Sequence, residues 1–331
     1  MNILNISAGS SSKKQDLLLL NLEIIIKSKK MEDNMNIPSQ DNRIMIVTGA
    51  NAGLGYETAL SLAKKGAKVV MACRSITKAE AAKNKIEKAH PNADLEIMQI
   101  DLSSLKSVRN FASEYQKKYD KLDVLINNAG VMAPPYSKTE DGFELQLGAN
   151  YLGHFLLTGL LLDTLIKTPH SRIVTLSSLV HKNGQINFDD LQSEQTYSPA
   201  KAYAQSKLAC LMFAFELQRR LQKAGIQHTI STASHPGIAD TELSRHYPKW
   251  LYLLVKYTIA PFLTHSAYEG AKPTILAALG EAKGGEYFGP TGYKEYKGKA
   301  GKATFTDLSQ DEAIAKQLWN VSEELVGFSY L

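Results

Sequence analysis

Short apolar runs alternate with longer stretches of helical periodicity along most of the chain. The apolar runs predict buried strands at 44–48, 68–73, 95–100, 122–127, 172–177 and 228–234. Between them, apolar residues recur at three- and four-residue spacing, which predicts helices at 54–65, 77–90, 104–119, 141–167 and 200–224. Strand and helix in this alternation predict an α/β fold, in which helices cover both faces of a parallel sheet.

Residues 1–42, which precede this pattern, differ in composition. They are polar and Ser-rich at first, apolar over 17–26 with polar interruptions, and then rich in Lys, Asn and Asp. The apolar stretch is shorter than the roughly 20 residues of a membrane span, so no transmembrane span is predicted. We expect a poorly ordered extension with one short amphipathic helix. The alternatives are a weak organelle-targeting or membrane-surface element, and a protein that starts at Met31 or Met35.

The region 241–305 is irregular and rich in aromatic residues and glycine. It is too short to be an independent domain, so we expect an excursion from the main sheet that includes a substrate lid. A final helix is predicted at 310–326. Residues 43–331 are therefore predicted to form a single domain.

Composition and charge exclude several classes of function. With 331 residues, of which 44% are apolar, the chain can bury a large core. Its net charge of +5 is small, and Lys and Arg are scattered among acidic residues, which argues against a nucleic-acid partner. Cys73 and Cys210 lie far apart and outside any zinc-binding spacing, so neither a disulfide framework nor a metal site is predicted. A cytoplasmic location fits this cysteine usage best.

A glycine-rich loop joins the first predicted strand to the first helix. The segment TGANAGLG at 48–55 has the spacing GxxxGxG. Glycine lets the backbone turn sharply, lets a pyrophosphate approach, and brings the helix N-terminus towards its negative charge. The loop therefore predicts a nucleotide site, with a plain strand-to-helix turn as the alternative. The predicted cofactor contacts here are Gly49, Asn51, Gly53, Leu54 and Gly55.

The end of the second predicted strand indicates which dinucleotide binds. Where a carboxylate would hold the ribose 2′-hydroxyl of NAD, this chain has Arg74. A guanidinium suits a 2′-phosphate, which favours NADP (NADPH), although a solvated arginine at a helix start is the alternative. Asp101 and Leu102 follow the third strand and are expected to touch the adenine, and Asp101 is also a good residue to cap the next helix.

Tyr203 and Lys207 carry the candidate chemistry. Because they are four residues apart, they share one face of the predicted helix at 200–224, and the ammonium can lie beside the phenol. A nearby cation favours the phenolate and so makes the phenol a better proton donor near neutral pH. Alone, the pair is of low specificity, because Tyr and Lys occur at this spacing on many solvated helices.

With these motifs in register, nearly all of the chain after residue 43 resembles the short-chain dehydrogenase/reductase family. The matching pieces occur in family order: TGANAGLG at 48–55, NNAG at 127–130, Asn150, Ser177-Ser178, Tyr203 with Lys207, and Pro236-Gly237 with Thr241. The stretch 188–194 and the helix that carries Tyr203 look most like the retinol dehydrogenase and WW-domain oxidoreductase branch, which neighbours protochlorophyllide reductase. The resemblance implies a doubly wound Rossmann fold with a mainly parallel seven-stranded sheet flanked by helices.

The resemblance also implies a catalytic tetrad of Asn150, Ser178, Tyr203 and Lys207. Tyr203 would exchange a proton with the substrate oxygen, to which Ser178 would hydrogen-bond. Lys207 would assist Tyr203 and hold the nicotinamide ribose, and Asn150 would position a water between Lys207 and solvent. For Asn150, a buried amide that satisfies backbone groups is the alternative. Successive strand residues face opposite ways, so Ser177 is left a supporting role.

Further cofactor contacts follow from the same resemblance. They are Asn128, Ala129, Gly130, Tyr203, Lys207, Pro236, Gly237 and Thr241. Asn127 and Asn128 are expected to brace the sheet rather than to do chemistry. His235 is interpreted as structural, because the family needs no histidine in this role.

The predicted function is that of an NADP(H)-dependent oxidoreductase, which transfers a hydride between nicotinamide and a carbonyl or alcohol. The aromatic and aliphatic segment 246–263 stands where the family has its substrate lid, and Val131, Met132 and the residues 179–181 should border the same pocket. Because such pockets are mainly apolar, a lipophilic aldehyde or ketone such as a retinoid-like compound is expected. A segment that packs on the core, a partner subunit or a membrane surface is the alternative, which leaves peripheral membrane contact open.

Two other functions are weighed against this one. A light-dependent pigment reductase related to protochlorophyllide reductase is disfavoured by the scarcity of cysteine. A non-catalytic NADP-sensing regulator would be expected to have a damaged tetrad, whereas all four positions are intact. The family commonly forms homodimers or homotetramers through the long helices predicted at 141–167 and 200–224, and we expect such an assembly here.

Overall fold

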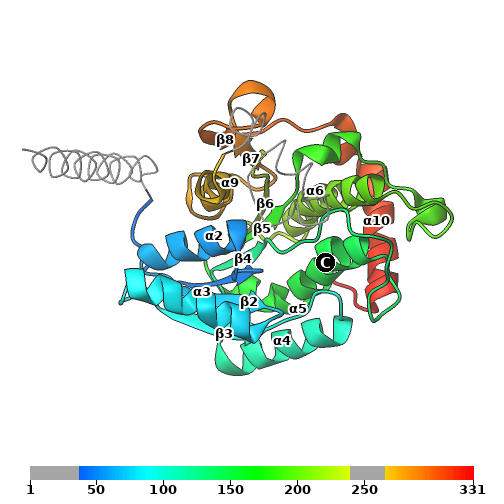
Figure 1. Cartoon of the computed structure of the whole chain (residues 1–331). Coiled ribbons are helices and arrows are strands. Elements are labelled where there is room, and N and C mark those ends of the chain that lie inside the picture. Colours follow the sequence, from blue (N-terminus) through cyan, green and yellow to red (C-terminus); the bar gives the residue numbers. More distant parts are fainter. Residues whose placement is uncertain (1–36, 239–264) are drawn as a thin grey trace, which may run out of the picture. The chain divides into compact units, whose positions relative to one another are not determined.

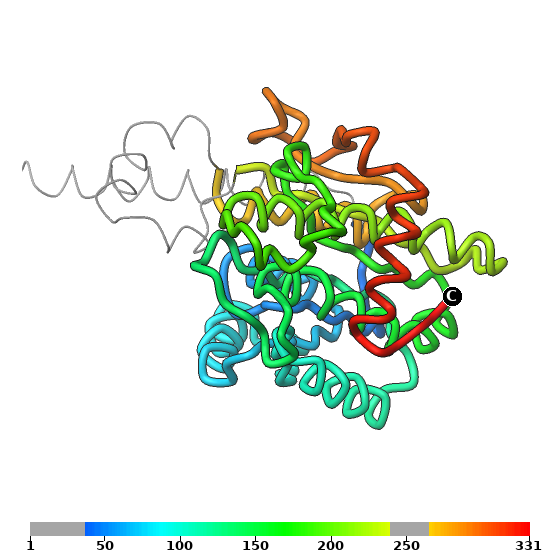
Figure 2. Tube along the Cα trace, turned by 90° about the vertical axis from the view of Figure 1, so that its right-hand side faces the viewer, coloured from blue at the N-terminus to red at the C-terminus, as the bar shows by residue number. Residues whose placement is uncertain are grey.

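The computed structural model describes residues 37–238 and 265–331. The expectations for 1–36, for Thr241 and for the segment 246–263 lie outside the described residues. Contacts within the chain gather Ser39–Leu331 into one unit, which holds all the strands and helices given below. Figure 2 traces the path of this unit through the described ranges.

In the described part of the chain, eight strands form one sheet in the order β3-β2-β1-β4-β5-β6-β7-β8. They are β1 (Ile44–Thr48), β2 (Lys68–Cys73), β3 (Leu95–Gln99), β4 (Val124–Asn127), β5 (Arg172–Leu176), β6 (Ile230–Ser234), β7 (Tyr287–Pro290) and β8 (Ala300–Lys302). The first seven run parallel, and β8 pairs antiparallel with β7. The predicted doubly wound fold is confirmed, with one short antiparallel strand beyond the seven expected.

The helices lie in two layers around the sheet. They are α2 (Gly53–Lys64), α3 (Ile76–Ala89), α4 (Leu105–Lys118), α5 (Gly153–Lys167), α6 (Pro199–Lys223), α9 (Ala267–Leu279) and α10 (Glu312–Val326), with short 3-10 helices η3 (Leu179–Asn183), η4 (Phe188–Asp190), η6 (Tyr293–Glu295) and η7 (Asp307–Gln310). Figure 1 shows α2, α3 and α9 on one face, and α4, α5 and α6 on the other. The helices predicted at 54–65, 77–90, 104–119, 200–224 and 310–326 are confirmed within about two residues at each end, whereas the one predicted at 141–167 begins later than expected.

The strand order places the candidate site. The chain runs outward from β1 to β3 and then returns to β4 on the other side of β1. Val47 of β1 stands opposite Ile126 of β4, so the carboxyl ends of these two strands lie side by side. Ligands of doubly wound sheets bind in the crevice at such a reversal. The glycine loop after β1 and the NNAG segment after β4 therefore meet there.

A π-helical segment, η2 (Leu147–Leu152), leads into α5 without a break. The wider turn accommodates one residue more than an α-helix, and such turns often occur at functional sites. Asn150 lies within it, and its side chain is buried.

The last helix and the residues after it cover α5 and α6. Trp319 of α10 packs its ring 4.9 Å from that of Phe155 on α5 and 5.8 Å from that of Phe213 on α6, centre to centre. The hydroxyl of Tyr330 donates to the carbonyl of Phe155 at 3.0 Å. Every residue of α6 from Ala202 to Gln218 is buried within the single chain. That stretch of α6 therefore offers no exposed residue to a partner subunit. The oligomeric state stays a prediction.

One helix within the described ranges is long and apolar enough to cross a membrane. It spans Leu147–Lys167, and 83% of its most apolar window is buried inside the protein. Its apolar composition is accounted for by its place in the core, between the sheet and α10.

Candidate active site

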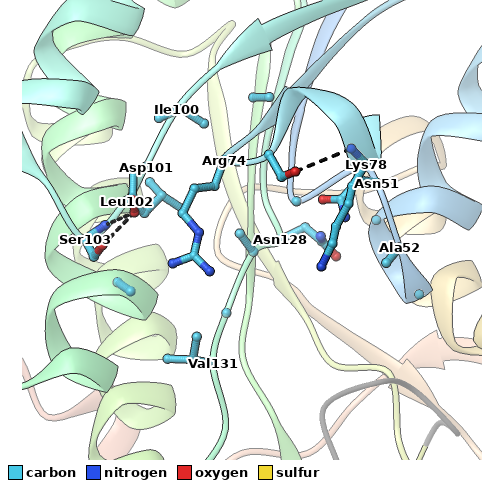
Figure 3. Close-up of a pocket in the computed structure, with 18 of the residues that line it drawn as sticks. Asn51, Ala52, Arg74, Lys78, Ile100, Asp101, Leu102, Ser103, Asn128 and Val131 are labelled. Atoms are coloured by element: carbon cyan, nitrogen blue, oxygen red, sulfur yellow. Dashed lines mark hydrogen bonds between the residues drawn. The ribbon is translucent and has the colours of Figure 1, made fainter. Parts of the chain in front are cut away.

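A pocket of about 580 Å³ lies at the carboxyl ends of β1, β2 and β4. Figure 3 shows side chains from several loops converging on it. The predicted cofactor residues that line it are Gly49, Asn51, Gly53, Leu54, Gly55, Arg74, Asp101, Leu102, Asn128, Ala129 and Gly130. The structure therefore brings together the glycine loop, the end of β2, the end of β3 and the NNAG segment, as the sequence predicts.

The glycine loop is shaped so that a larger residue would not fit. Gly49 has φ +69° and Gly53 has φ +53°, both in the left-handed region that favours glycine. A Cβ on Gly55 would lie 2.3 Å from the carbonyl oxygen of Gly49 and 2.5 Å from the side-chain nitrogen of Asn128. The first turn of α2 is thus pressed against the loop, with its free N–H groups towards the pocket. A dinucleotide pyrophosphate fits this cradle of backbone donors.

A buried hydrogen-bond chain ties the glycine loop to the NNAG segment. Because the carbonyl of Asn150 can only accept, Nδ1 of His154 donates to it at 2.8 Å, and Nε2 accepts from the Thr48 hydroxyl at 2.9 Å. The Thr48 oxygen accepts the backbone N–H groups of Asn128 at 2.9 Å and Ala129 at 3.0 Å. Burial lowers the pKa of His154 to about 4, so the imidazole is neutral at physiological pH. Asn128 braces the loops, as expected.

Positive charge gathers where the adenosine end of a dinucleotide would lie. Arg74 is exposed and directs its guanidinium into the pocket (Figure 3). Ser75 caps α3, accepting the backbone N–H of Lys78 at 3.4 Å, and the Lys78 side chain also lines the pocket. Sequence reasoning missed Lys78, although its place one turn after Arg74, on the helix that Ser75 starts, was a signal for it.

Asp101 does not cap the next helix. Ser104 does, accepting the backbone N–H of Ser107 at 3.4 Å. The Asp101 carboxylate instead accepts from the backbone N–H of Ser103 at 2.9 Å and from its hydroxyl at 2.6 Å. A serine three residues further on was available to start the helix, so the capping interpretation was wrong. Asp101 is left lining the pocket.

Tyr203 and Lys207 come together as the helix spacing predicts. Both are mostly buried on α6, and the Lys207 ammonium nitrogen lies 6.0 Å from the centre of the Tyr203 ring. That ammonium donates to the carbonyl of Leu176, the last residue of β5, at 3.0 Å. A Cβ on Gly130 would lie 3.5 Å from the same nitrogen. Gly130 lines the pocket, whereas Tyr203 and Lys207 stand outside its lining, with Lys207 next to Gly130.

The two serines after β5 face opposite ways, as strand alternation requires. Ser177 is buried, and its hydroxyl donates to the carbonyl of Lys207 at 2.8 Å. Ser178 is partly exposed and extended, with φ −158° and ψ 159°, and it caps η3. The hydroxyl of Ser177 thus supports the helix that carries Tyr203. The hydroxyl of Ser178 remains the candidate to hydrogen-bond to the reacting oxygen of the substrate.

The side chain of Asn150 is engaged with backbone and with α6. Its oxygen accepts the backbone N–H of Val131 at 2.7 Å, and its nitrogen donates to the Val131 carbonyl and to the Ser206 hydroxyl, both at 3.0 Å. These bonds match the alternative of a buried amide that satisfies backbone groups. A water held for Lys207 stays a prediction for Asn150.

The loop after β6 is held by the contacts of a buried histidine, His235. His235 is fully buried: its Nδ1 accepts the backbone N–H of Gly237 at 3.1 Å, and its Nε2 lies 3.4 Å from a carboxylate oxygen of Glu295. Burial lowers its pKa, and a Cβ on Gly289 would lie 2.0 Å from its Nε2. These contacts give His235 the structural place expected of it. Pro236 and Gly237 stand outside the pocket lining, and their cofactor role stays a prediction.

Comparison with known proteins identifies the family of this chain. The sequence model of the short chain dehydrogenase family matches residues 43–251. Human retinol dehydrogenase 13 is 44% identical over 292 residues, which are 86% of this chain and 85% of that protein. Mouse retinol dehydrogenase 12 is 41% identical over 300 residues, which are 90% of this chain and 89% of that protein.

Solved structures agree on the fold. A putative uncharacterized protein from Mycobacterium paratuberculosis has a TM-score of 0.74 and 39% identity, covering 89% of this chain and 97% of its own. The RhlG/NADP complex from Pseudomonas aeruginosa, at 24% identity and a TM-score of 0.59, covers 75% of this chain and 94% of its own, and shows the fold alone. With its retinol dehydrogenase relatives and its matched family model, the chain belongs to the short-chain dehydrogenase/reductase family and is a nicotinamide-dependent oxidoreductase that acts on CH–OH groups.

Proposed function

We propose that this protein is an NADP(H)-dependent enzyme that interconverts a lipophilic aldehyde or ketone and its alcohol, with a retinoid-like compound as the model substrate. The observation that carries the proposal is the pairing of Tyr203 with Lys207, next to Gly130 of a pocket that Arg74 and Lys78 also line. The pair suits a proton transfer, and the two cations suit a phosphate.

The cofactor, when bound, supplies or takes the hydride. Hydride arrival at a carbonyl carbon leaves charge on its oxygen, and a donor held in place there lowers the barrier. Tyr203 gives its phenolic proton to this oxygen in reduction and takes it back in oxidation. Lys207 stabilises the phenolate that forms, because its ammonium is fixed nearby by Leu176. Ser178 donates a hydrogen bond to the same oxygen and orients it towards Tyr203.

The preference for NADP over NAD rests on Arg74 and Lys78. A 2′-phosphate carries charge that the fork of donors on Arg74 can bind, and Lys78 adds a second cation from the first turn of α3. The N-terminus of α3 begins two residues after Arg74, and its helix dipole adds partial positive charge there. NAD has a neutral ribose hydroxyl at this position, so it would gain less from Arg74 than NADP does.

The substrate class rests on the apolar part of the pocket lining. It comprises Val131, Met132, Pro134, Leu145 and Ala149. Several curated relatives bear the name retinol dehydrogenase, whose substrate is a long apolar alcohol. We infer the same class for this chain. The cytoplasmic location and the homodimer or homotetramer stay predictions.

Oxidation of NADPH across a panel of aldehydes, ketones, quinones and retinoids tests the proposal. We expect turnover of apolar carbonyl compounds with NADPH and slower turnover with NADH. Tyr203→Phe serves as the inactive control for contaminating reductases. Absence of turnover with every compound, in both directions and with both cofactors, would contradict the proposal. Equal rates with the two cofactors would refute the NADP assignment alone.

A further inference from the structure

A buried glutamine, Gln146, lies at a junction of three segments that border the site. It is fully buried at the start of η2, four residues before Asn150. Its side-chain oxygen accepts the backbone N–H of Ala133 at 2.8 Å. Its side-chain nitrogen donates to the Tyr197 hydroxyl at 3.1 Å and to the carbonyl of Pro199 at 3.0 Å. One amide thus connects the segment after NNAG, the start of η2 and the start of α6.

The segment after NNAG forms the apolar wall of the pocket, through Val131, Met132 and Pro134. We call residues 131–134 the wall segment. It has no strand or helix of its own, and Ala133 has φ +49°, a conformation that alanine rarely adopts. Such a backbone persists only where surrounding contacts determine it. Its position therefore depends on the side chains that hold it.

Three side chains bind four backbone groups of the wall segment. Asn150 binds the N–H and the carbonyl of Val131. Gln146 binds the N–H of Ala133, and the Tyr197 hydroxyl donates to the carbonyl of Pro134 at 2.8 Å. Gln146 and Asn150 are one turn apart on the same helix face, so they act on the wall segment together.

The same contacts fix the distance between the wall segment and the proton donor. Pro199 is the first residue of α6, and Tyr203 follows one turn later on the same face. The bond from Gln146 to the Pro199 carbonyl holds that turn, and the Tyr197 hydroxyl bridges Gln146 and Pro134. The wall segment and the Tyr203 turn are therefore linked through Gln146, beside the bonds that Asn150 makes to Val131 and to Ser206 on α6.

We propose that Gln146, with Tyr197, is a positioning residue that fixes the wall segment against the Tyr203 turn and thereby sets which carbonyl compounds the site accepts. This inference rests on the proposed function for the reaction itself. If the wall segment is held, an aldehyde of the right width is kept within reach of Tyr203, and a misfit is rejected. If it is loose, substrates of different widths react at more similar rates.

The test replaces Gln146 by Met, which is close in volume and lacks the amide, and replaces Tyr197 by Phe, which removes only the hydroxyl. The matched control is Gln205→Met. Gln205 is also a buried amide on α6, and it accepts the N–H of Asn187 and donates to the carbonyl of Leu191, both at 3.0 Å. It holds a segment that does not line the pocket.

Two readouts are measured on the full chain. Hydrogen exchange, with and without NADPH, reports the order of the wall segment. The ratio of kcat/KM between a bulky and a small aldehyde reports discrimination. We expect Gln146→Met and Tyr197→Phe to speed exchange at the amides of 131–133 and to shrink the ratio on the order of tenfold, since small misplacements have large kinetic effects. Gln205→Met should speed exchange near 187–191 and leave the ratio unchanged.

Unchanged exchange at the amides of 131–133 in Gln146→Met would overturn the positioning role. Faster exchange of the wall segment in Gln146→Met, with a kcat/KM ratio of bulky to small aldehyde equal to that of Gln205→Met, would overturn the role in specificity. If the wild-type protein reduces none of the aldehydes, the proposed function fails, and the exchange data still decide whether Gln146 holds the wall segment. A lower melting temperature shared by Gln146→Met and Gln205→Met, with no difference in exchange or ratio, would leave both glutamines as structural residues only and refute the proposal.

Discussion

The ammonium of Lys207 stands 6.0 Å from the centre of the Tyr203 ring, and one helical turn separates the two residues on α6. The position of the ammonium is fixed, because it donates a hydrogen bond to the carbonyl of Leu176 at 3.0 Å. Its charge is therefore held beside the phenol whether or not a substrate is present. This fixed relationship is the basis of the first prediction.

Tyr203→Phe should remove the proton donor and leave the rest of the site in place. General acid catalysis contributes about 10²- to 10⁴-fold, so we expect turnover to fall by roughly that factor. NADPH binding, followed by fluorescence, should be retained, because the ring still fills its place. Tyr293→Phe, a change on an exposed tyrosine, is the control. Substantial activity in Tyr203→Phe would show that another group donates the proton.

Arg74→Asp should shift the cofactor preference from NADPH towards NADH. A hydrogen bond to a charged group contributes about 1.5–3 kcal/mol, so kcat/KM for NADPH should fall by roughly ten- to a hundredfold. Lys78→Ala should have a smaller effect in the same direction. Lys88→Ala, on an exposed lysine at the other end of α3, should have none. An unchanged ratio of NADPH to NADH rates in Arg74→Asp would mean that the 2′-phosphate is recognised elsewhere.

The stability of the fold should fall in acid because His154 is buried in its neutral form. Burial lowers its pKa to about 4, below the ordinary value of 6.5. Between these pH values the unfolded chain binds a proton that the folded protein does not, so the contribution is complete above pH 6.5 and is lost as pH falls towards 4. Urea unfolding of His154→Phe should show a slope against pH that is smaller by about one proton. The same slope in variant and wild type would assign the acid sensitivity to other groups.

Trp319→Ala should destabilise the fold by about 3–5 kcal/mol, the usual cost of removing a large buried aromatic side chain. Trp319 packs between Phe155, Phe213 and Tyr330, and the Arg220 guanidinium lies 4.2 Å from its ring centre. Urea denaturation measures the change. Asn320→Ala, at the exposed neighbouring position, should stay close to wild type. Comparable losses in the two variants would show that α10 contributes little to the core.

Removal of residues 1–38 should leave the catalytic unit folded and active. Contacts within the chain divide it between Pro38 and Ser39. A longer deletion to residue 42 should lower the melting temperature, because Gln40 is buried and its backbone N–H donates to the carbonyl of Lys65 at 2.7 Å. Thermal melts of the two truncated proteins measure the difference. Collapse of the shorter deletion would contradict the interpretation of the N-terminal segment as an extension.

The strands of the sheet could be predicted where burial on both faces produces an unbroken apolar run. β1 and β2 coincide with their predicted ranges, 44–48 and 68–73. The strands β7 and β8 were missed, because YFGP and AGK are short and carry no such pattern. The helix α9 was also missed, since Pro273 lies inside it and argues against a helix. Packing of α9 against α2 and the sheet overrides that local preference.

The candidate site divides in the same way between local and distant causes. The glycine loop and the Tyr203/Lys207 pair could be predicted, since each is set by spacing along a few residues. Lys78 was missed although its place shortly after Arg74 was a local signal for it, whereas Gln146 could not be predicted, because its importance depends on what the fold brings near it. The capping role of Asp101 was wrong because Ser104 competes for the same helix start. Distances between segments decide these cases, and a single sequence does not contain them.

Because α10 packs over α5 and α6, the fold can be completed only late in synthesis. The Arg109 guanidinium donates to the carbonyl of Val326 across a separation of 217 residues, and Tyr330 reaches Phe155 across 175. Contacts so distant in sequence form late, because a long loop must close before they add stability. The apolar faces of α5 and α6 therefore stay uncovered on the ribosome until residues near 330 emerge, and that interval is when the nascent chain is most in need of a chaperone.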